Sequence, residues 1–241
     1  MSNTLRLISG ELKRLISYKL LARSLATAFI WMIVFLFMSK SDSRNIAPLF
    51  MFVDTCIVSI MLIGASFYFE QQGSTIKSMM VMPVSIGQIL ISKIVASLAL
   101  GLVLVTITCA ALFFIHGITF NYALLLLFVL LAVAVHASIG FFLALYSKGL
   151  TTMLVMLVAY MLIFVVPTIL LAFHVIDTQY EWVVMISPSH TASKLLSSVV
   201  SGSFDIHKVL LGSFYLPVLS AVLLRFVVLP KFKSRAVQGG N

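Results

Sequence analysis

Several residue types that could do chemistry gather in one polar segment, residues 70–85, between two long apolar runs. Glu70 supplies a carboxylate, which can favour the N-terminus of a following helix or pair with a basic residue on another protein. Gly73 permits a sharp chain reversal that other residues resist. The hydroxyl of Ser74 or of Thr75 can then cap a short helix. These residue types suit docking and chain reversal rather than bond cleavage.

The pattern predicts that this capped helix covers residues 76–82 and that Pro83 ends it. Met79, Met80 and Met82 would give the helix an adaptable apolar surface. Such a surface suits a groove on another protein. The simpler alternative is a helical hairpin turn that lies on the lipid surface.

The segment resembles the cytoplasmic coupling loop of type-2 ABC transporter permeases, in which E-x-x-G-[x]-T is followed by P-[x]-S and a lysine-bearing entry to the third helix. The matching positions are Glu70, Gly73, Thr75, Pro83, Ser85 and Lys93. In the family Gly and Thr are more often adjacent, whereas Ser74 intervenes here. The resemblance implies that a separate ATPase subunit, which binds ATP and Mg, touches this loop. It also implies a second permease copy or a paralogue, and ATP-driven export.

Two further ionisable residues lie inside apolar runs, where such groups call for a functional hypothesis. Asp54 could line an outer cavity and meet a cationic cargo, or it could make a hydrogen bond at a dimer or helix interface. His136 could serve a cargo path in the same way, but we expect an interhelical hydrogen bond.

Motifs for catalysis or for cofactor binding are missing from the sequence. It has no glycine-rich P-loop and no H-E-x-x-H motif, and its five histidines are scattered. We therefore expect no catalytic, cofactor-binding or metal-binding residues on this chain, and ATP hydrolysis on another polypeptide.

Composition defines the elements that must position these residues. The chain has 241 residues, of which 61% are hydrophobic and 10% charged, so it is not a soluble globular domain. A membrane span needs about 20 apolar residues. The sequence predicts an all-α integral membrane protein, a single domain over residues 1–241 with six spans. The expected spans are 21–37, 48–69, 94–115, 122–146, 151–173 and 209–229.

The net charge of +9 could indicate nucleic-acid binding, but the placement of the basic residues indicates membrane topology instead. Twelve of the sixteen lysines and arginines fall on the side of the N-terminus, which predicts cytoplasmic N- and C-termini in a cell membrane. The same excess favours contact with anionic lipids of the bilayer.

Two segments outside the spans carry helical patterns. The apolar pattern of residues 1–20 predicts an amphipathic elbow helix in the membrane interface, as type-2 permeases typically have. The alternative is an ordinary basic leader. The external connection 174–208 predicts short re-entrant helices, including one over 191–200, or else a plain exposed loop. The other outer connections, 39–47 and 116–121, are expected to be short loops.

The function expected from the resemblance is a permease subunit of an ABC exporter, with an amphipathic or hydrophobic cargo such as a drug, a peptide or a lipid. An importer permease would carry its coupling motif late in the chain, whereas this one is early. The alternative from another class is a membrane enzyme or an immunity-type membrane protein that acts without an ATPase.

Overall fold

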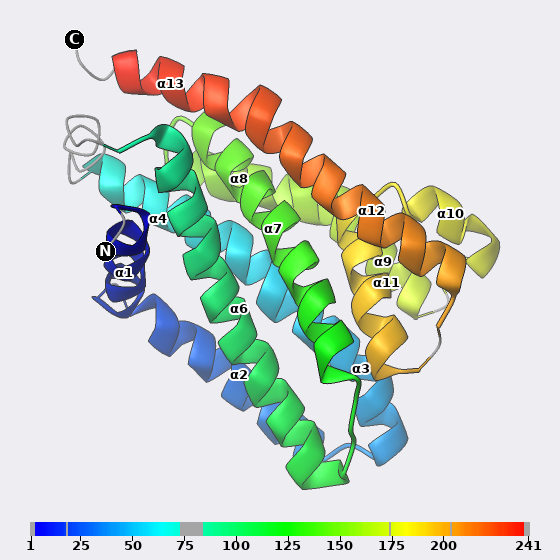
Figure 1. The fold of residues 1–241 in the computed structure, drawn as a ribbon. Helices are drawn as coiled ribbons and strands as arrows, with labels where there is room; N and C mark the ends of the chain where they lie inside the picture. The colour runs from blue at the N-terminus through cyan, green and yellow to red at the C-terminus, as the bar shows by residue number, and fades with distance from the viewer. Residues whose placement is uncertain (1–2, 18, 73–83, 174, 203, 239–241) are drawn as a thin grey trace.

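The computed structural model describes residues 3–17, 19–72, 84–173, 175–202 and 204–238, which form a bundle of helices without a β-strand (Figure 1). In chain order the elements are α1 (Asn3–Ser17), α2 (Leu20–Leu36), α3 (Lys40–Phe52), η1 (Val53–Ile57), α4 (Val58–Gln72), α6 (Ile86–His116), α7 (Tyr122–Tyr146), α8 (Leu150–Tyr160), η2 (Met161–Val165), α9 (Val166–Ala172), η3 (Thr178–Tyr180), α10 (Glu181–Val184), α11 (Pro188–Val200), α12 (Ile206–Val222), η4 (Leu223–Val228) and α13 (Leu229–Gln238). The all-α prediction is thus confirmed for the described residues.

Five of the six expected spans correspond to helices long and apolar enough to cross a bilayer, within the described residues. Those five are Lys40–Glu70, Ile86–His116, Tyr122–Tyr146, Leu150–Ala172 and Ile206–Ser234. The expected first span corresponds to α2, which has only 17 residues and an apolar part at Ser24–Leu36. At 1.5 Å per residue α2 is about 26 Å long, somewhat less than the roughly 30 Å hydrocarbon core. The count of six is therefore not confirmed.

The second expected span begins earlier than the sequence predicts. Residues 39–47 are not a loop, because α3 starts at Lys40, where the Ser39 side chain accepts the backbone N–H of Asp42 at 3.2 Å. Pro48 lies inside this helix rather than at its start. The prediction was wrong because polar residues and a proline near the membrane surface are typical of loops. Here the packing of α3 against α11 and α6 holds this stretch in a helix.

The long helix α6 begins and ends at residues with clear capping chemistry. Ser85 accepts the N–H of Gln88 at 3.2 Å, while the Gln88 side chain accepts the Ser85 N–H at 2.9 Å, which is a capping box. At the other end Gly117 adopts a left-handed conformation with φ of 64°, so the chain turns there toward α7. Residues 84 and 85 thus lead directly into α6.

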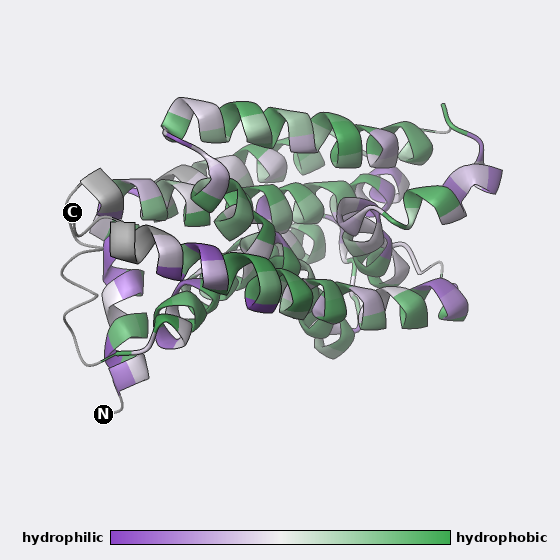
Figure 2. Cartoon of the chain, turned by 90° about the horizontal axis from the view of Figure 1, so that it is seen from above, coloured by the Kyte–Doolittle hydropathy of each residue, from purple (hydrophilic) through white to green (hydrophobic). Residues whose placement is uncertain are grey.

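α7 lies at the centre of the bundle and packs against α4, α6, α11 and α12. Its small residues allow close approach: a Cβ added at Gly140 would lie 3.0 Å from the carbonyl oxygen of Ile60 on α4. Close backbone packing of this kind holds helices together in a membrane, where apolar burial drives association little. Figure 2 shows hydrophobic residues along most of the helix lengths and hydrophilic residues gathered near the helix ends.

In the connection 174–208, the part from Pro188 to Val200 is a packed helix rather than a plain exposed loop. The expected helix over 191–200 is present as part of α11, which starts one turn earlier because Ser187 caps it and Pro188 takes its first position. α11 packs against α3, α7 and α12, and its residues from Pro188 to Ala192 are buried.

Candidate coupling site at one end of the bundle

The polar segment singled out from the sequence is described only at its two edges. Gly73, Ser74, Thr75, Met79, Met80, Met82 and Pro83, with the expected helix 76–82, lie outside the described residues. Glu70, near the end of α4, and Ser85, before α6, are described. Figure 1 shows these two helix ends beside α1, at the same end of the bundle as α13.

Glu70 is almost completely buried, with 1% of its surface exposed. Its Oε1 atom lies 2.5 Å from the guanidinium of Arg14 on α1 and 2.5 Å from the ammonium of Lys93 on α6. The carboxylate therefore pairs with basic residues of its own chain. One acidic side chain joins three helices.

Lys93 is the other centre of this contact and is only 2% exposed. Its Nζ atom lies 3.1 Å from Glu11 Oε1 and donates to Ser66 Oγ at 2.9 Å. Arg14 contacts Glu11 as well, at 3.2 Å. We call Glu11, Arg14, Glu70 and Lys93 the ion-pair cluster. Its two carboxylates and two cations balance in charge, which makes the burial of Glu11, Glu70 and Lys93 tolerable, while the Arg14 side chain is 30% exposed.

Helical spacing explains how the cluster assembles. Glu11 and Arg14 are three residues apart on α1, and Ser66 and Glu70 are four apart on α4, so each pair shares one helix face. Lys93 belongs to the buried face of α6. The sequence interpretation noted Lys93 as the entry to the third helix but did not place it, or Glu11, at the site. The missed signal is a lysine eight residues inside an apolar helix.

Asp54 lies in η1 and is 1% exposed. Its Oδ1 atom accepts the indole N–H of Trp31 on α2 at 3.1 Å, and its Oδ2 atom is buried without a hydrogen-bond partner among the described residues. Trp31 in turn stacks on Phe50 at 4.0 Å between ring centroids. Asp54 thus links α2 to the second span through a hydrogen bond.

His136, in the middle of α7, is completely buried. Its Nδ1 atom is 2.7 Å from the carbonyl oxygen of Ala132 on the same helix, whereas the sequence interpretation expected a bond between helices. The ring packs edge-on against Phe52 and Tyr160 from two other elements. His136 and Asp54 are not brought to the ion-pair cluster.

A second charged group, which the sequence interpretation did not identify, holds α10, α11 and α12 together. Glu181 lies 2.7 Å from Lys194 and also pairs with Lys208. Burial alone would raise the pKa of Glu181, but hydrogen bonds from the two lysines outweigh it and lower this pKa. His190 lies 3.8 Å from Glu181, and burial lowers the pKa of His190 to about 4. This imidazole is therefore neutral at pH 7.

The five long apolar helices define an integral membrane protein with several spans. Residues 40–229 match the family described as ABC-2 family transporter protein, so the chain belongs to that family, whose members are the membrane components of ABC transporters and are not themselves catalytic. No curated protein matches the sequence.

Proposed function

We propose that this chain is the permease subunit of an ATP-driven exporter, and that segment 70–85 receives force from a separate ATPase subunit that binds ATP and Mg. The observation that carries the proposal is the ion-pair cluster, which joins α1, α4 and α6 beside both ends of that segment. Force that the ATPase exerts on the segment would therefore move α1, α4 and α6 together.

The cluster holds together the helices that adjoin the segment on either side. Glu70 lies three residues before Gly73, and Lys93 lies eight residues after Ser85. Both are buried and paired, so displacement of the segment cannot be absorbed by free rotation of the adjoining helix ends. Because α4 also packs tightly on α7 at Gly140, movement would reach the centre of the bundle.

We further propose that the end of the bundle with the ion-pair cluster faces the cytoplasm. Lys148, between α7 and α8, and Lys231, on α13, are near this end, whereas Lys40 and Lys194 belong to elements at the opposite end (Figure 1). This separation supports cytoplasmic termini by the positive-inside rule. In a cysteine-free protein, a cysteine placed at 40 should react with an impermeant reagent in intact cells, and a cysteine placed at 148 should react only after the membrane has been opened. Labelling of both in intact cells would contradict the orientation.

The proposed cargo is amphipathic or hydrophobic, and a second permease copy or a paralogue completes the path. Two spans support this because they are the least buried of the five. In the most apolar 18-residue stretch of each, 28% is buried in Leu150–Ala172 and 22% in Ile206–Ser234. Their apolar faces are available to lipid, to a second subunit or to an apolar cargo that enters from the bilayer.

Co-purification and reconstitution test the function directly. The full chain should bring down an ATPase encoded beside it, and the complex in liposomes should hydrolyse ATP faster with its cargo present. Glu70→Gln, which keeps the shape but removes the charge, should retain ATPase binding and lose coupling between hydrolysis and export, while Lys13→Ala on the exposed side of α1 should behave as wild type. A chain that binds no ATPase would instead act alone, as a membrane enzyme or an immunity-type protein would.

A further inference from the structure

The last span is one uninterrupted helical run of α12, η4 and α13, and it packs on the rest of the bundle along a single stripe. The described residues buried in this run recur at helical spacing, so they share one face of the helix. They are Val209, Gly212, Leu216, Ser220, Val228 and Phe232. α12 and η4 pack on α7, where Ser220 and Ser138 share a hydrogen bond at 2.8 Å. The stripe ends at Phe232, on α13.

Phe232 brings the last span into contact with the helix that precedes segment 70–85. Its ring lies 6.0 Å from the ring of Phe67 on α4, edge to face at 69°, and each of the two residues is only 4% exposed. Aromatic rings attract each other in this geometry. Phe67 is one turn before Glu70 on α4. α13 is therefore packed on α4 next to the ion-pair cluster.

Two more contacts hold α13 at this end of the bundle. The Nζ atom of Lys231 lies 5.0 Å from the centroid of the Tyr146 ring, close enough for attraction between an ammonium and an aromatic face. Tyr146 is the last residue of α7. α13 also packs against α6, the helix that follows segment 70–85. α13 thus contacts the helices on both sides of the segment as well as the central helix.

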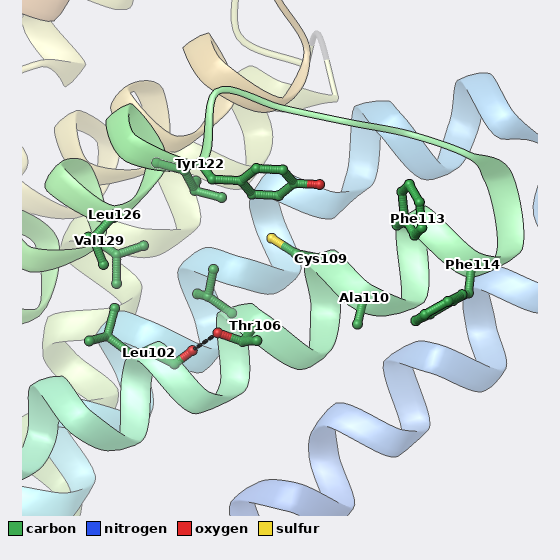
Figure 3. A pocket seen from close by; sticks show the side chains of 11 residues that line it. Leu102, Thr106, Cys109, Ala110, Phe113, Phe114, Tyr122, Leu126 and Val129 are labelled. Atoms are coloured by element: carbon green, nitrogen blue, oxygen red, sulfur yellow. Dashed lines mark hydrogen bonds between the residues drawn. The ribbon is translucent and has the colours of Figure 1, made fainter.

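The opposite ends of α6 and α7 are arranged differently. There the two helices form an open apolar groove on the outside of the bundle, with Leu102, Cys109 and Tyr122 among its lining residues (Figure 3). Tyr122 is the first residue of α7, whereas Lys231 of α13 contacts the last. The contacts of α13 thus belong to the end of the bundle next to Glu70.

We propose that Phe232 is a positioning residue, which makes α13 move with α4 and so carries movement of segment 70–85 into the last span. The ion-pair cluster cannot do this, because its four residues lie on α1, α4 and α6. Packed side chains between rigid helices are a physical route for such coupling. Because the movement comes from the ATPase, this role rests on the proposed function.

The contacts of the last span define the direction of the movement. At 1.5 Å per residue Phe232 is about 18 Å along the helix from Ser220, which is hydrogen-bonded to α7. Ser220 is midway in sequence between Phe232 and Lys208, the residue that pairs with Glu181 at the other end. Displacement at Phe232 would tilt the helix about Ser220. The start of α12 would then move by a similar amount in the opposite direction.

Distance measurement in the ATPase complex tests the proposal without knowledge of the cargo. Spin labels on Lys40→Cys and Ile206→Cys, in a cysteine-free complex, report the first residues of α3 and α12. Trapping of ATP with vanadate should change this distance by several ångströms in the wild type. Phe232→Ala should keep ATPase binding and hydrolysis but lose the change, whereas Lys233→Ala, exposed on the same helix, should retain it. An unchanged distance in the wild type, or a full change in Phe232→Ala, would overturn the proposal.

Matched variants separate positioning from general destabilisation. Phe67→Ala removes the other ring and should abolish the change as well, so it decides the question should Phe232→Ala fail to fold. Phe232→Leu keeps a buried apolar side chain and should retain most of the change. In the isolated chain, Phe232→Ala should raise hydrogen exchange of residues 67–72 several-fold, whereas Lys233→Ala should not. Unchanged exchange there would show that Phe232 does not position α4.

Glu70→Gln distinguishes failure of this proposal from failure of the proposed function. A chain that binds no ATPase would refute both. If the ATPase binds and Glu70→Gln abolishes the change in distance while Phe232→Ala leaves it intact, segment 70–85 is coupled to the ATPase and only the role of Phe232 is refuted.

Discussion

Removal of Glu70 tests whether the ion-pair cluster acts as one unit. Breaking a buried ion pair by removal of one partner costs about 3–5 kcal/mol, because the other charge is left uncompensated. In Glu70→Ala, however, Lys93 keeps Glu11 at 3.1 Å and Ser66 at 2.9 Å, and Arg14 keeps Glu11 at 3.2 Å. We therefore expect a loss at the lower end, about 3 kcal/mol of unfolding free energy.

The opposite removal should cost more. Lys93→Ala leaves two buried carboxylates, Glu11 and Glu70, around Arg14, whose side chain is 30% exposed and better hydrated. We expect about 4 kcal/mol. The double variant keeps only the neutral Glu11–Arg14 pair, so its loss should be about 4–5 kcal/mol instead of the sum of about 7. The difference, a coupling energy of about 2–3 kcal/mol, is the quantity predicted.

The assay is denaturation of the purified protein in mixed micelles, followed by tryptophan fluorescence, for wild type, both single variants and the double variant. Lys13→Ala on the exposed side of α1 serves as the control and should change the unfolding free energy by no more than about 0.5 kcal/mol. Single effects that add within about 0.5 kcal/mol would refute the reasoning, because independent sites behave in that way. Effects below 1 kcal/mol in both single variants would show that the buried contacts do not form.

Three other predictions concern separate parts of the bundle. Asp54→Asn should preserve the acceptor for Trp31 and leave assembly and export unchanged, whereas Asp54→Ala should cost about 1–3 kcal/mol in a denaturation assay; altered export of a cationic cargo in Asp54→Asn alone would favour a role for the charge. Gly140→Ala should destabilise by about 1–3 kcal/mol, since its Cβ would press on the α4 backbone, while Gly10→Ala, with open space around it, should be neutral or stabilising. Stability should fall between pH 6.5 and pH 4, because the unfolded chain takes up a proton on His190 in that range while burial holds the folded pKa at about 4; the loss is at most about 3 kcal/mol, and an equal loss in His190→Gln would contradict it.

Helix positions were predictable where polar residues mark both ends of an apolar run. The fourth expected span, 122–146, has the bounds found for α7, since Asn121 caps its start and Ser147 ends it. Prediction failed where tertiary packing decides. The start of α3 at Lys40 depends on contacts with α6 and α11, and these partners are 46 or more positions away in the sequence.

The candidate site divides in the same way. Local chemistry was sufficient to single out Glu70, but not the contacts that bury it, because Arg14 is 56 positions and Lys93 is 23 positions away. One signal was nevertheless available. Lys93 lies inside an apolar helix, and a cation there needs a carboxylate. Glu11 and Glu70 are the two acidic residues that the charge distribution assigns to the same side, and both contact Lys93.

Burial of Glu70 changes what a partner ATPase could recognise. The sequence allowed this carboxylate to pair with a basic residue of the ATPase, but its oxygen already faces Arg14 and Lys93, and the side chain is nearly inaccessible. Extraction of the charge for a new partner would break two buried contacts. Under the proposed function, we therefore expect the apolar residues Met79 and Met80 to contact the ATPase. Glu70 would contribute indirectly, by holding the helices that adjoin the segment to α1. Charge removal at Glu70 should accordingly weaken coupling more than it weakens ATPase binding.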